Sequence, residues 1–139
     1  MNERHKCLLC LGSNVDGIHH LKNAEQTLNQ LFGPIRWGTI IETEPWGTNL
    51  SGSFFNRAAS LYTSLSSEEL VRRFKQIECR NGRTSDSKAR GVVPLDIDLL
   101  AYDDRILKPD DLEKEYVKQA LSDRPMPAYL ASLTYPRRV

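Results

Sequence analysis

The chain has 139 residues, a length that suits one compact domain with a core that needs neither disulfides nor a structural metal. Lys and Arg total 19 against 18 Asp and Glu, so the overall charge favours neither nucleic acid nor an anionic membrane surface as a partner. No apolar run approaches the roughly 20 residues that span a bilayer, and the N-terminus lacks the apolar core of a signal peptide. We therefore expect a single cytoplasmic domain over 1–139, with an irregular tail from about 122.

The first elements in chain order are a buried strand and an amphipathic helix. Residues 6–11 form a short apolar run that ends in a Gly-Ser-Asn turn, which predicts a strand. Apolar residues then recur at helical spacing over 21–31, with Asp16 or Asn14 available as the cap. Gly33, followed by proline, ends this helix.

Two further strands and a second helix follow. Residues 35–43 and 54–63 have the composition of strands, and a Glu-Pro-Trp-Gly sequence stops the first of them. Ser66 followed by Glu69 predicts a capping box, after which apolar residues recur on one face of a helix. Gly82 closes this second helix.

The remaining elements complete a recognisable order. Residues 84–91 are small, polar and basic, as expected of a mobile loop, and an apolar strand follows over 93–100. Residues 109–122 can form a helix started by proline. The order strand, helix, strand, strand, helix, strand predicts an α+β domain with a ferredoxin-like βαββαβ core, an antiparallel sheet with helices packed on one face. That architecture hosts many unrelated activities, so function must be argued from the site.

The strand over 93–100 carries Asp96 and Asp98 near its centre. Residues i and i+2 of a strand point to the same side, so both carboxylates leave one face while their apolar neighbours enter a core. Adjacent like charges are costly unless a cation lies between them, and Mg²⁺ is bound by a few carboxylates together with substrate phosphates and water. Two solvated carboxylates on a half-exposed strand explain this short pattern equally well.

Basic residues precede that strand. Arg83, Lys88 and Arg90 lie in or beside the loop and are within reach of whatever the aspartates hold. A lone charge run is typical of a solvated loop, whereas cations beside a metal-carboxylate pair indicate phosphate. Glu78 lies in the last turn of the second helix, where its charge opposes the helix macrodipole, so we expect a partner or a task for it. A salt bridge to Arg83 would supply the partner.

A third group combines aromatic and small polar side chains, namely Thr43, Trp46, Phe54, Asn56 and Tyr116. A planar heterocycle could stack between the aromatic faces while the Asn and Thr side chains read its hydrogen-bonding edge. Taken singly, Phe54 and Trp46 are of types that lie more often in a core.

Five short motifs, taken in chain order, carry a resemblance to a known family: LGSN (11–14), ETEPWG (42–47), FFN (54–56), IECRNGR (77–83) and LDIDLL (95–100). With these motifs the chain resembles 6-hydroxymethyl-7,8-dihydropterin pyrophosphokinase from about Leu8 to Leu121. The resemblance implies Mg²⁺-dependent transfer of pyrophosphate from ATP to 6-hydroxymethyl-7,8-dihydropterin in folate biosynthesis, giving AMP.

The resemblance also implies roles for the three groups of residues. Asp96 and Asp98 would hold two Mg²⁺ ions and, with Arg83 and Arg90, form the catalytic group. The pterin pocket would be lined by Thr43, Trp46, Phe54, Asn56 and Tyr116. The nucleotide side would comprise Glu78, Arg83, Lys88, Arg90 and Lys114.

Several positions depart from the family pattern. Val93 and Ser85 stand where the family has arginine, Asp110 where it has histidine, and Lys114 where it has arginine. Each lost contact to the triphosphate removes a charge-assisted hydrogen bond worth about 1.5–3 kcal/mol, which the remaining loop cations, Arg90 among them, could replace.

Two alternatives to a working enzyme therefore remain open. The first is a catalytically weak or inactive relative that binds a pterin or a nucleotide. The second is an unrelated ferredoxin-like domain that binds RNA on its sheet, which would need basic and aromatic residues along the sheet and is disfavoured by the near-neutral charge. The choice between monomer and homodimer is also open.

Overall fold

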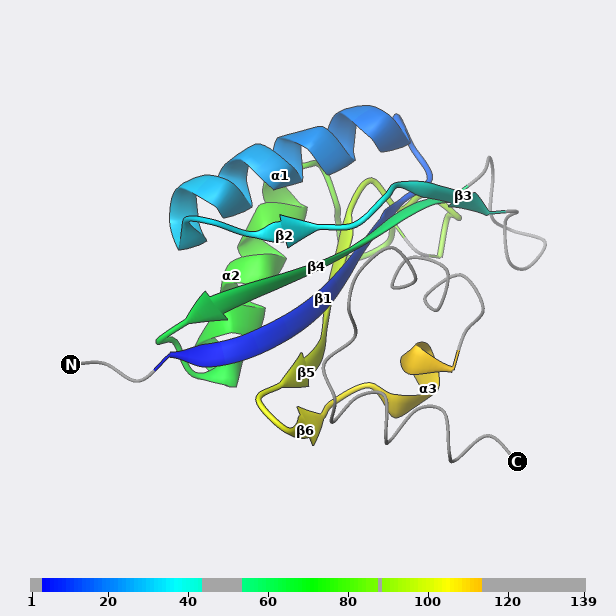
Figure 1. The fold of residues 1–139 in the computed structure, drawn as a ribbon. Helices are drawn as coiled ribbons and strands as arrows, with labels where there is room; N and C mark the ends of the chain where they lie inside the picture. The colour runs from blue at the N-terminus through cyan, green and yellow to red at the C-terminus, as the bar shows by residue number, and fades with distance from the viewer. Residues whose placement is uncertain (1–3, 44–53, 88, 114–139) are drawn as a thin grey trace.

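The structure is a computed structural model that describes residues 4–43, 54–87 and 89–113 (Figure 1). Its elements, in chain order, are β1 (His5–Ser13), α1 (Gly17–Phe32), β2 (Arg36–Trp37), β3 (Ile41–Thr43), β4 (Phe54–Thr63), α2 (Ser67–Arg80), β5 (Asp96–Tyr102), β6 (Arg105–Ile106) and α3 (Pro109–Leu112). No helix among these residues is long and apolar enough to cross a membrane.

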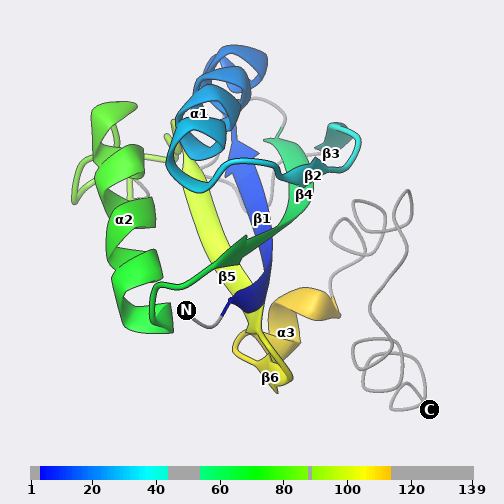
Figure 2. The ribbon, with the colours of Figure 1, turned by 60° about the vertical axis from the view of Figure 1, so that its left-hand side comes forward.

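The strands form one six-stranded antiparallel sheet. Its order is β2-β4-β1-β5-β6, and β3 also pairs with β4. The central strand β1 is buried from Cys7 to Ser13, as its apolar sequence predicts. Helices α1 and α2 lie side by side on one face (Figure 2), so the predicted α+β arrangement is confirmed. We call the opposite face of the sheet the far face.

The main core lies between the sheet and the two long helices. Alternate residues of β1 and β5 enter this core because successive side chains of a strand point to opposite faces. The helices contribute their apolar stripes, which follow the helical spacing read from the sequence. The largest fully buried side chains of this core are Leu9, Leu11, Leu21, Leu28, Leu61, Leu70, Phe74, Ile77 and Leu95.

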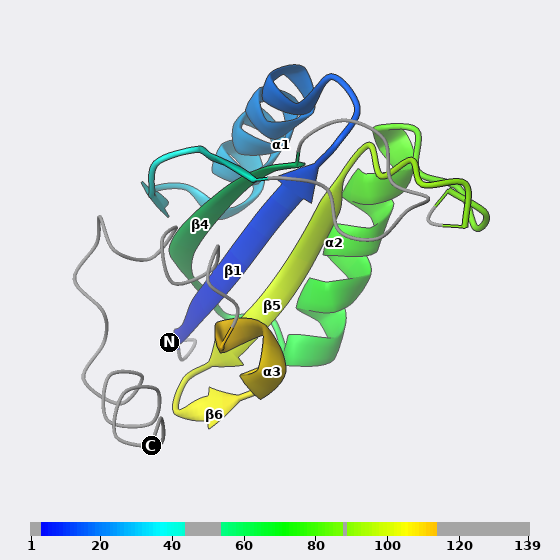
Figure 3. The same cartoon turned by 90° about the vertical axis from the view of Figure 1, so that its right-hand side faces the viewer.

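The short helix α3 lies on the far face, in front of β5 (Figure 3). The pairing of β1 with β5 shifts between Leu8 and Leu9, so Leu100 and Ala101 both belong to a small far-face cluster. Leu112 of α3 packs into that cluster. The helix begins at proline, as predicted, and the remainder of the predicted helix and tail lies outside the described residues.

Two local details differ from the sequence-based expectation. The strand predicted over 35–43 is interrupted between β2 and β3. There the Gly38 N–H still donates to the Ala58 carbonyl of β4, while the Gly38 carbonyl accepts from the guanidinium of Arg57 at 2.7 Å. The capping box of α2 is half formed. The Ser66 hydroxyl accepts from the Glu69 N–H, as predicted, but the Glu69 carboxylate binds arginines of the next turn.

Candidate active site

Asp96 and Asp98 begin β5 and lie on the far face. Ile97 and Leu99 are buried in the main core beneath α1 and α2. The alternation of the strand therefore directs both carboxylates away from the helices, and both side chains are half-buried.

The strand register places a residue expected to line the pterin pocket and a residue expected to bind metal in one row across the sheet. Asp96 of β5 lies opposite Gly12 of β1, Gly12 lies opposite Asn56 of β4, and Asn56 lies opposite Ile41 of β3. Residues paired in this way point to the same face. Two interstrand steps separate Asn56 from Asp96, a distance of about 9 to 10 Å between their backbones. Phe54, two residues before Asn56, lies on the same face.

The structure thus brings together only part of the predicted site. Phe54 and Asn56 share the far face with the two aspartates, and Thr43 pairs with Phe54 in the register of β3 and β4. Four further predicted site residues lie outside the described residues, namely Trp46, Lys88, Lys114 and Tyr116.

Arg83 connects the end of α2 to the first aspartate. Its Nη1 donates to Asp96 Oδ1 at 2.7 Å and to the Leu95 carbonyl at 3.2 Å, and it lies 3.5 Å from Glu78 Oε1. Burial alone would lower the pKa of Arg83, but the hydrogen bond and charge of Asp96 outweigh it and raise the pKa. Arg83 is therefore a permanent positive charge on one oxygen of the candidate metal site.

Glu78 is buried, with 5% of its surface exposed, and faces the start of β5. Its Oε2 accepts the Ile97 N–H at 2.8 Å, a shorter contact than the expected ion pair with Arg83. Burial raises the pKa of Glu78 and the charge of Asp96 adds to this, whereas the Ile97 N–H and Arg83 oppose it. Glu78 thus holds the backbone between the two aspartates.

Asn14 is a site-building residue that the sequence reading treated only as a possible helix cap. Its Nδ2 donates to the Gly91 carbonyl at 2.9 Å and its Oδ1 accepts the Val93 N–H at 2.7 Å. Its own N–H donates to the Val93 carbonyl at 3.0 Å. Asn14 therefore holds the segment that enters the aspartate strand. Asp16 occupies the cap position of α1 but makes no side-chain cap hydrogen bond.

The loop before β5 contains hydrogen-bonded turns. Buried Ser87 accepts the Thr84 N–H at 2.8 Å, and their hydroxyls are 2.9 Å apart. Arg90, whose side chain is 59% exposed, lies 3.4 Å from Asp86. The hydroxyl of Thr84 and the charge of Arg90 lower the pKa of Asp86. Arg90 thus lies at the surface of the loop, whereas Arg83 is paired with Asp96.

Three of the four departures from the family pattern, all except Lys114, lie within the described residues. Val93 is buried, with 5% of its surface exposed, and Ser85 is exposed in the loop. Asp110 is exposed in α3. Neither Val93 nor Ser85 carries a charge for a phosphate.

The donor set of the two aspartates fits a hard cation. Within residues 4–43, 54–87 and 89–113, no group of three or more His, Cys, Asp or Glu side chains could hold a metal ion by itself. Two carboxylates on one strand face suit Mg²⁺, which takes its remaining oxygens from phosphates and water. A cation at Asp96 would share that carboxylate with Arg83.

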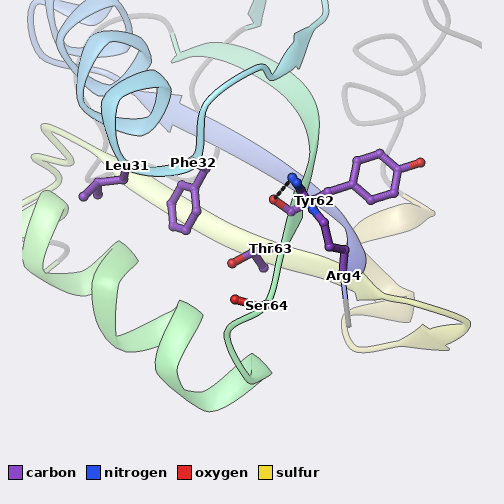
Figure 4. Close-up of a pocket in the computed structure, with 6 residues that line it drawn as sticks. All are labelled: Arg4, Leu31, Phe32, Tyr62, Thr63 and Ser64. Carbon is purple, nitrogen blue, oxygen red and sulfur yellow. Dashed lines mark hydrogen bonds between the residues drawn. The ribbon is translucent and has the colours of Figure 1, made fainter. Parts of the chain in front are cut away.

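A cavity of about 300 Å³ lies at the opposite end of the sheet, beside the start of β1 (Figure 4). Leu31 of α1 borders it with 45% of its surface exposed, although the helical spacing placed it on the apolar face. The Arg4 guanidinium reaches the Tyr62 carbonyl there at 3.5 Å. About eight residues of strand, roughly 26 Å, separate Arg4 from Gly12, so this cavity is distant from the aspartates.

Comparisons with known proteins identify the family. The model of the family described as 7,8-dihydro-6-hydroxymethylpterin-pyrophosphokinase matches residues 8–125. A 2-amino-4-hydroxy-6-hydroxymethyldihydropteridine pyrophosphokinase of Aquifex aeolicus is 34% identical over 101 residues, which are 72% of this chain and 62% of that protein. Its namesake in Bacillus subtilis is 31% identical over 107 residues, 75% of this chain and 64% of that protein. The folic acid synthesis protein FOL1 of Dictyostelium discoideum is 30% identical over 124 residues, 83% of this chain and 19% of that protein.

The matched part of the chain thus spans less than two thirds of the length of each of these relatives. The family match nevertheless covers most of the chain, including the strands that carry Gly12, Asn56 and both aspartates. The chain belongs to the 7,8-dihydro-6-hydroxymethylpterin-pyrophosphokinase family.

Proposed function

We propose that the protein transfers pyrophosphate from ATP to 6-hydroxymethyl-7,8-dihydropterin in folate biosynthesis and releases AMP. The observation that carries this proposal is the row of the sheet that joins Asn56, through Gly12, to Asp96. The Asn56 amide, which could form hydrogen bonds with a heterocycle, thereby lies on the same face as Asp96 and Asp98. These two carboxylates could bind a metal ion that in turn binds phosphate. The names of the family and of its relatives support the same reaction.

On the donor side, we expect Asp96 and Asp98 to hold two Mg²⁺ ions beside the phosphates of ATP. Bound there, Mg²⁺ would neutralise the charge that develops on the transferring group. Arg83 adds a fixed positive charge at Asp96, and Arg90 is an exposed cation on the adjoining loop. Phosphoryl-type transfer depends mainly on such positioning and charge neutralisation.

On the acceptor side, Asn56 would read the edge of the pterin while Phe54 contacts its ring. By the family resemblance, Thr43, Trp46 and Tyr116 would also belong to this pocket. In the reaction, the acceptor alcohol oxygen bonds to the β-phosphorus as the bond between that phosphorus and the oxygen of AMP breaks. The hydroxyl proton leaves to solvent. The site therefore has to orient the alcohol oxygen toward the phosphorus more than it has to supply a strong base.

A second candidate function is binding of the pterin or of a nucleotide without efficient transfer. Buried Val93 favours it, because its N–H is bound to Asn14 and its side chain has no charge for a phosphate. The two candidates differ in whether AMP forms.

AMP release distinguishes them. Purified protein is incubated with ATP, Mg²⁺ and the dihydropterin, with a parallel reaction that lacks the dihydropterin. Multiple turnovers of acceptor-dependent AMP are expected. Binding of the acceptor by folded protein without AMP would contradict the proposed transfer and support the binding relative.

The variant Asp96→Asn tests the donor side. It should lower kcat/KM by at least about 100-fold, because an amide neither neutralises a cation nor pairs with Arg83 as a carboxylate does. Asp103→Asn, in the turn that follows β5, is the matched control and should retain activity. Equal activity of Asp96→Asn and the wild type would contradict the assignment of this carboxylate.

A further inference from the structure

Strands β2 and β3 both pair with β4, one after the other along its edge (Figure 1). Trp37 of β2 lies opposite Ala59, whereas Ile41 of β3 lies opposite Asn56. Three residues therefore separate Trp37 from Ile41, but only two separate Asn56 from Ala59 on β4. One extra residue on one strand of an antiparallel pair is a β-bulge, and it shifts the pairing of all the residues that follow by one position.

The packing of two isoleucines beside the bulge agrees with this shift. Trp37 and Ile40 both pack against the main core, although residues three apart in an uninterrupted strand would point to opposite faces. Ile41 packs against the small cluster on the far face. The bulge thus determines which face of the sheet each of these residues of the edge meets.

The apolar pattern of β3 does not by itself favour this register. Without the bulge, Ile40 would lie opposite Asn56 and Ile41 would enter the main core. The two residues are identical, so the buried apolar area distinguishes the two registers only weakly. The register is therefore fixed by another contact.

The register matters at the end of β3, beside the proposed acceptor pocket. In the structure Thr43 lies opposite Phe54, and exposed Glu42 lies opposite Phe55. In the register without a bulge, Glu42 would lie opposite Phe54. Residues paired across strands share a face, so the Glu42 carboxylate would then lie beside an aromatic ring that is proposed to contact a heterocycle.

Arg57 of β4 lies opposite the bulge and binds it. Its Nε donates to the Gly38 carbonyl at 2.7 Å, and its Nη1 donates to Glu25 Oε1 of α1 at 2.7 Å. Its guanidinium carbon lies 4.8 Å from the centre of the Trp37 ring, over which it is placed as a cation. Because 16% of the Arg57 side chain is exposed, solvent competes little for these contacts.

We propose that Arg57 is a positioning residue, which stabilises the bulge and thereby sets the register of β3 against β4 for acceptor binding. This inference rests on the proposed function, because β3 and β4 carry residues expected to line the acceptor pocket. The planar guanidinium donates in two fixed directions, one toward the backbone of the bulge and one toward α1. The edge of the sheet is thus aligned against a long helix.

The register can be measured without any ligand. In isotopically labelled wild type and in Glu25→Gln, nuclear Overhauser contacts are expected between backbone protons of Asn56 and Ile41. Arg57→Met keeps an unbranched apolar side chain but loses the guanidinium, so contacts between Asn56 and Ile40 should appear in it. Wild type without the contact between Asn56 and Ile41, or Arg57→Met with that contact alone, would overturn the proposal.

Acceptor binding gives the functional readout, by isothermal titration. In Arg57→Met the affinity for the dihydropterin alcohol should fall about tenfold or more, the factor that corresponds to one lost contact of ordinary strength. Affinity for Mg²⁺ and ATP should change less than about threefold, because β1 separates β4 from the strand that carries the aspartates.

Glu25→Gln is the matched control. It removes the ion pair with Arg57 but keeps an acceptor oxygen for Nη1 and leaves the bond to the Gly38 carbonyl. Its acceptor affinity should change less than about threefold. Equal losses of acceptor affinity in Arg57→Met and Glu25→Gln would overturn the positioning role.

Deletion of Thr39 distinguishes positioning from general stabilisation. In a chain without Thr39, uninterrupted pairing from Trp37 onward brings Ile41 opposite Asn56, so Arg57 is no longer needed to set the register. Arg57→Met combined with this deletion should therefore regain acceptor affinity to within about threefold of the wild type. Destabilisation by loss of an ion pair would not be reversed in this way, and a folded double variant without recovery would overturn the proposal.

The outcomes also separate this inference from the proposed function. Acceptor bound by the wild type without AMP, together with a shifted register and weaker binding in Arg57→Met, would support the positioning role while contradicting transfer. An unchanged register in Arg57→Met would overturn the positioning role alone. No acceptor binding by the wild type would overturn both.

Discussion

The carboxylate of Glu78 is buried where the end of α2 meets the start of β5. It accepts the Ile97 N–H and lies near the guanidinium of Arg83. A buried backbone donor without a partner costs about 1–3 kcal/mol, so this hydrogen bond matters more to the fold than an exposed ion pair would. Its contribution to the site is to hold the strand segment that carries both aspartates.

Replacing Glu78 by Ala and by Gln should separate the hydrogen bond from the charge. Glu78→Ala leaves the Ile97 N–H without its acceptor and should lower the free energy of unfolding by about 1–3 kcal/mol. Glu78→Gln retains an acceptor oxygen and should cost less. Urea unfolding at neutral pH measures both. Equal losses in the two variants would contradict the role of the hydrogen bond.

The raised pKa of Glu78 also predicts a pH dependence. A carboxyl whose pKa is higher in the folded state adds stability below its ordinary pKa, and this stability is lost as pH rises through the folded-state pKa. The stability of Glu78→Gln relative to the wild type should therefore be greatest at neutral pH and decline as the solution is acidified below the folded-state value. A relative gain by Glu78→Gln on acidification would contradict the direction of the shift.

At the scale of elements, Asn14 joins the end of β1 to the segment that enters β5. The pairing cannot be read from sequence, because its partners, Gly91 and Val93, lie 77 and 79 residues away. Asparagine is also a common N-cap residue, and α1 begins three residues after Asn14, so the sequence fits a capping role equally well. Only the packed structure distinguishes the two roles.

Asn14→Ala should lower the free energy of unfolding by about 2 kcal/mol or more, because two buried backbone groups lose their partners. It should also weaken binding of Mg²⁺ and ATP, since the segment that leads to the aspartates is released. Asn29→Ala is the control, because the side-chain contact given for Asn29 is with the half-buried indole of Trp37, and its backbone bond to Gly33 is kept in alanine. Isothermal titration and urea unfolding give the two readouts. An unchanged free energy of unfolding in Asn14→Ala would show that the hydrogen bonds of Asn14 with Gly91 and Val93 do not stabilise the fold.

At the scale of the whole molecule, a polar contact joins the first strand to the last hairpin. His5 Nδ1 lies 2.7 Å from Asp103 Oδ2, and the Lys6 N–H donates to the other carboxylate oxygen at 3.0 Å. The His5 ring stacks on Tyr102, whose hydroxyl donates to the Leu65 carbonyl at 2.7 Å. These contacts tie the end of the sheet remote from the aspartates to the turn before α2.

The pKa of Asp103 predicts how this tie responds to acid. Its hydrogen bonds with His5 and with the Lys6 N–H lower that pKa. A carboxyl with a depressed folded-state pKa adds stability above its ordinary pKa, near 4, and that stability is lost as pH falls through the folded-state value. Between pH 4 and 2, the wild type should lose more stability than Asp103→Asn in thermal unfolding. Parallel losses in both proteins would contradict the prediction.

Much of this structure could be predicted from residues that are close together in the sequence. The periodicity of the chain predicted the strand Phe54–Thr63, the helix Ser67–Arg80 with its Ser66 cap, and the order of the ferredoxin-like core. Alternation in β5 was enough to place Asp96 and Asp98 on one face. These features depend on neighbours within a few residues, whose geometry the backbone dictates.

The tertiary structure decided the rest, because those features depend on residues distant in sequence. Strand register placed Asn56, Gly12 and Asp96 in one row, although 40 residues separate the asparagine from the aspartate. Packing brought the Asn14 side chain to the Val93 N–H and the Glu78 carboxylate to the Ile97 N–H. The sequence by itself determined which residues are candidates for the site and, through its motifs, the family to which the chain belongs. Only the pairing of strands and the burial of polar groups determined which of them meet.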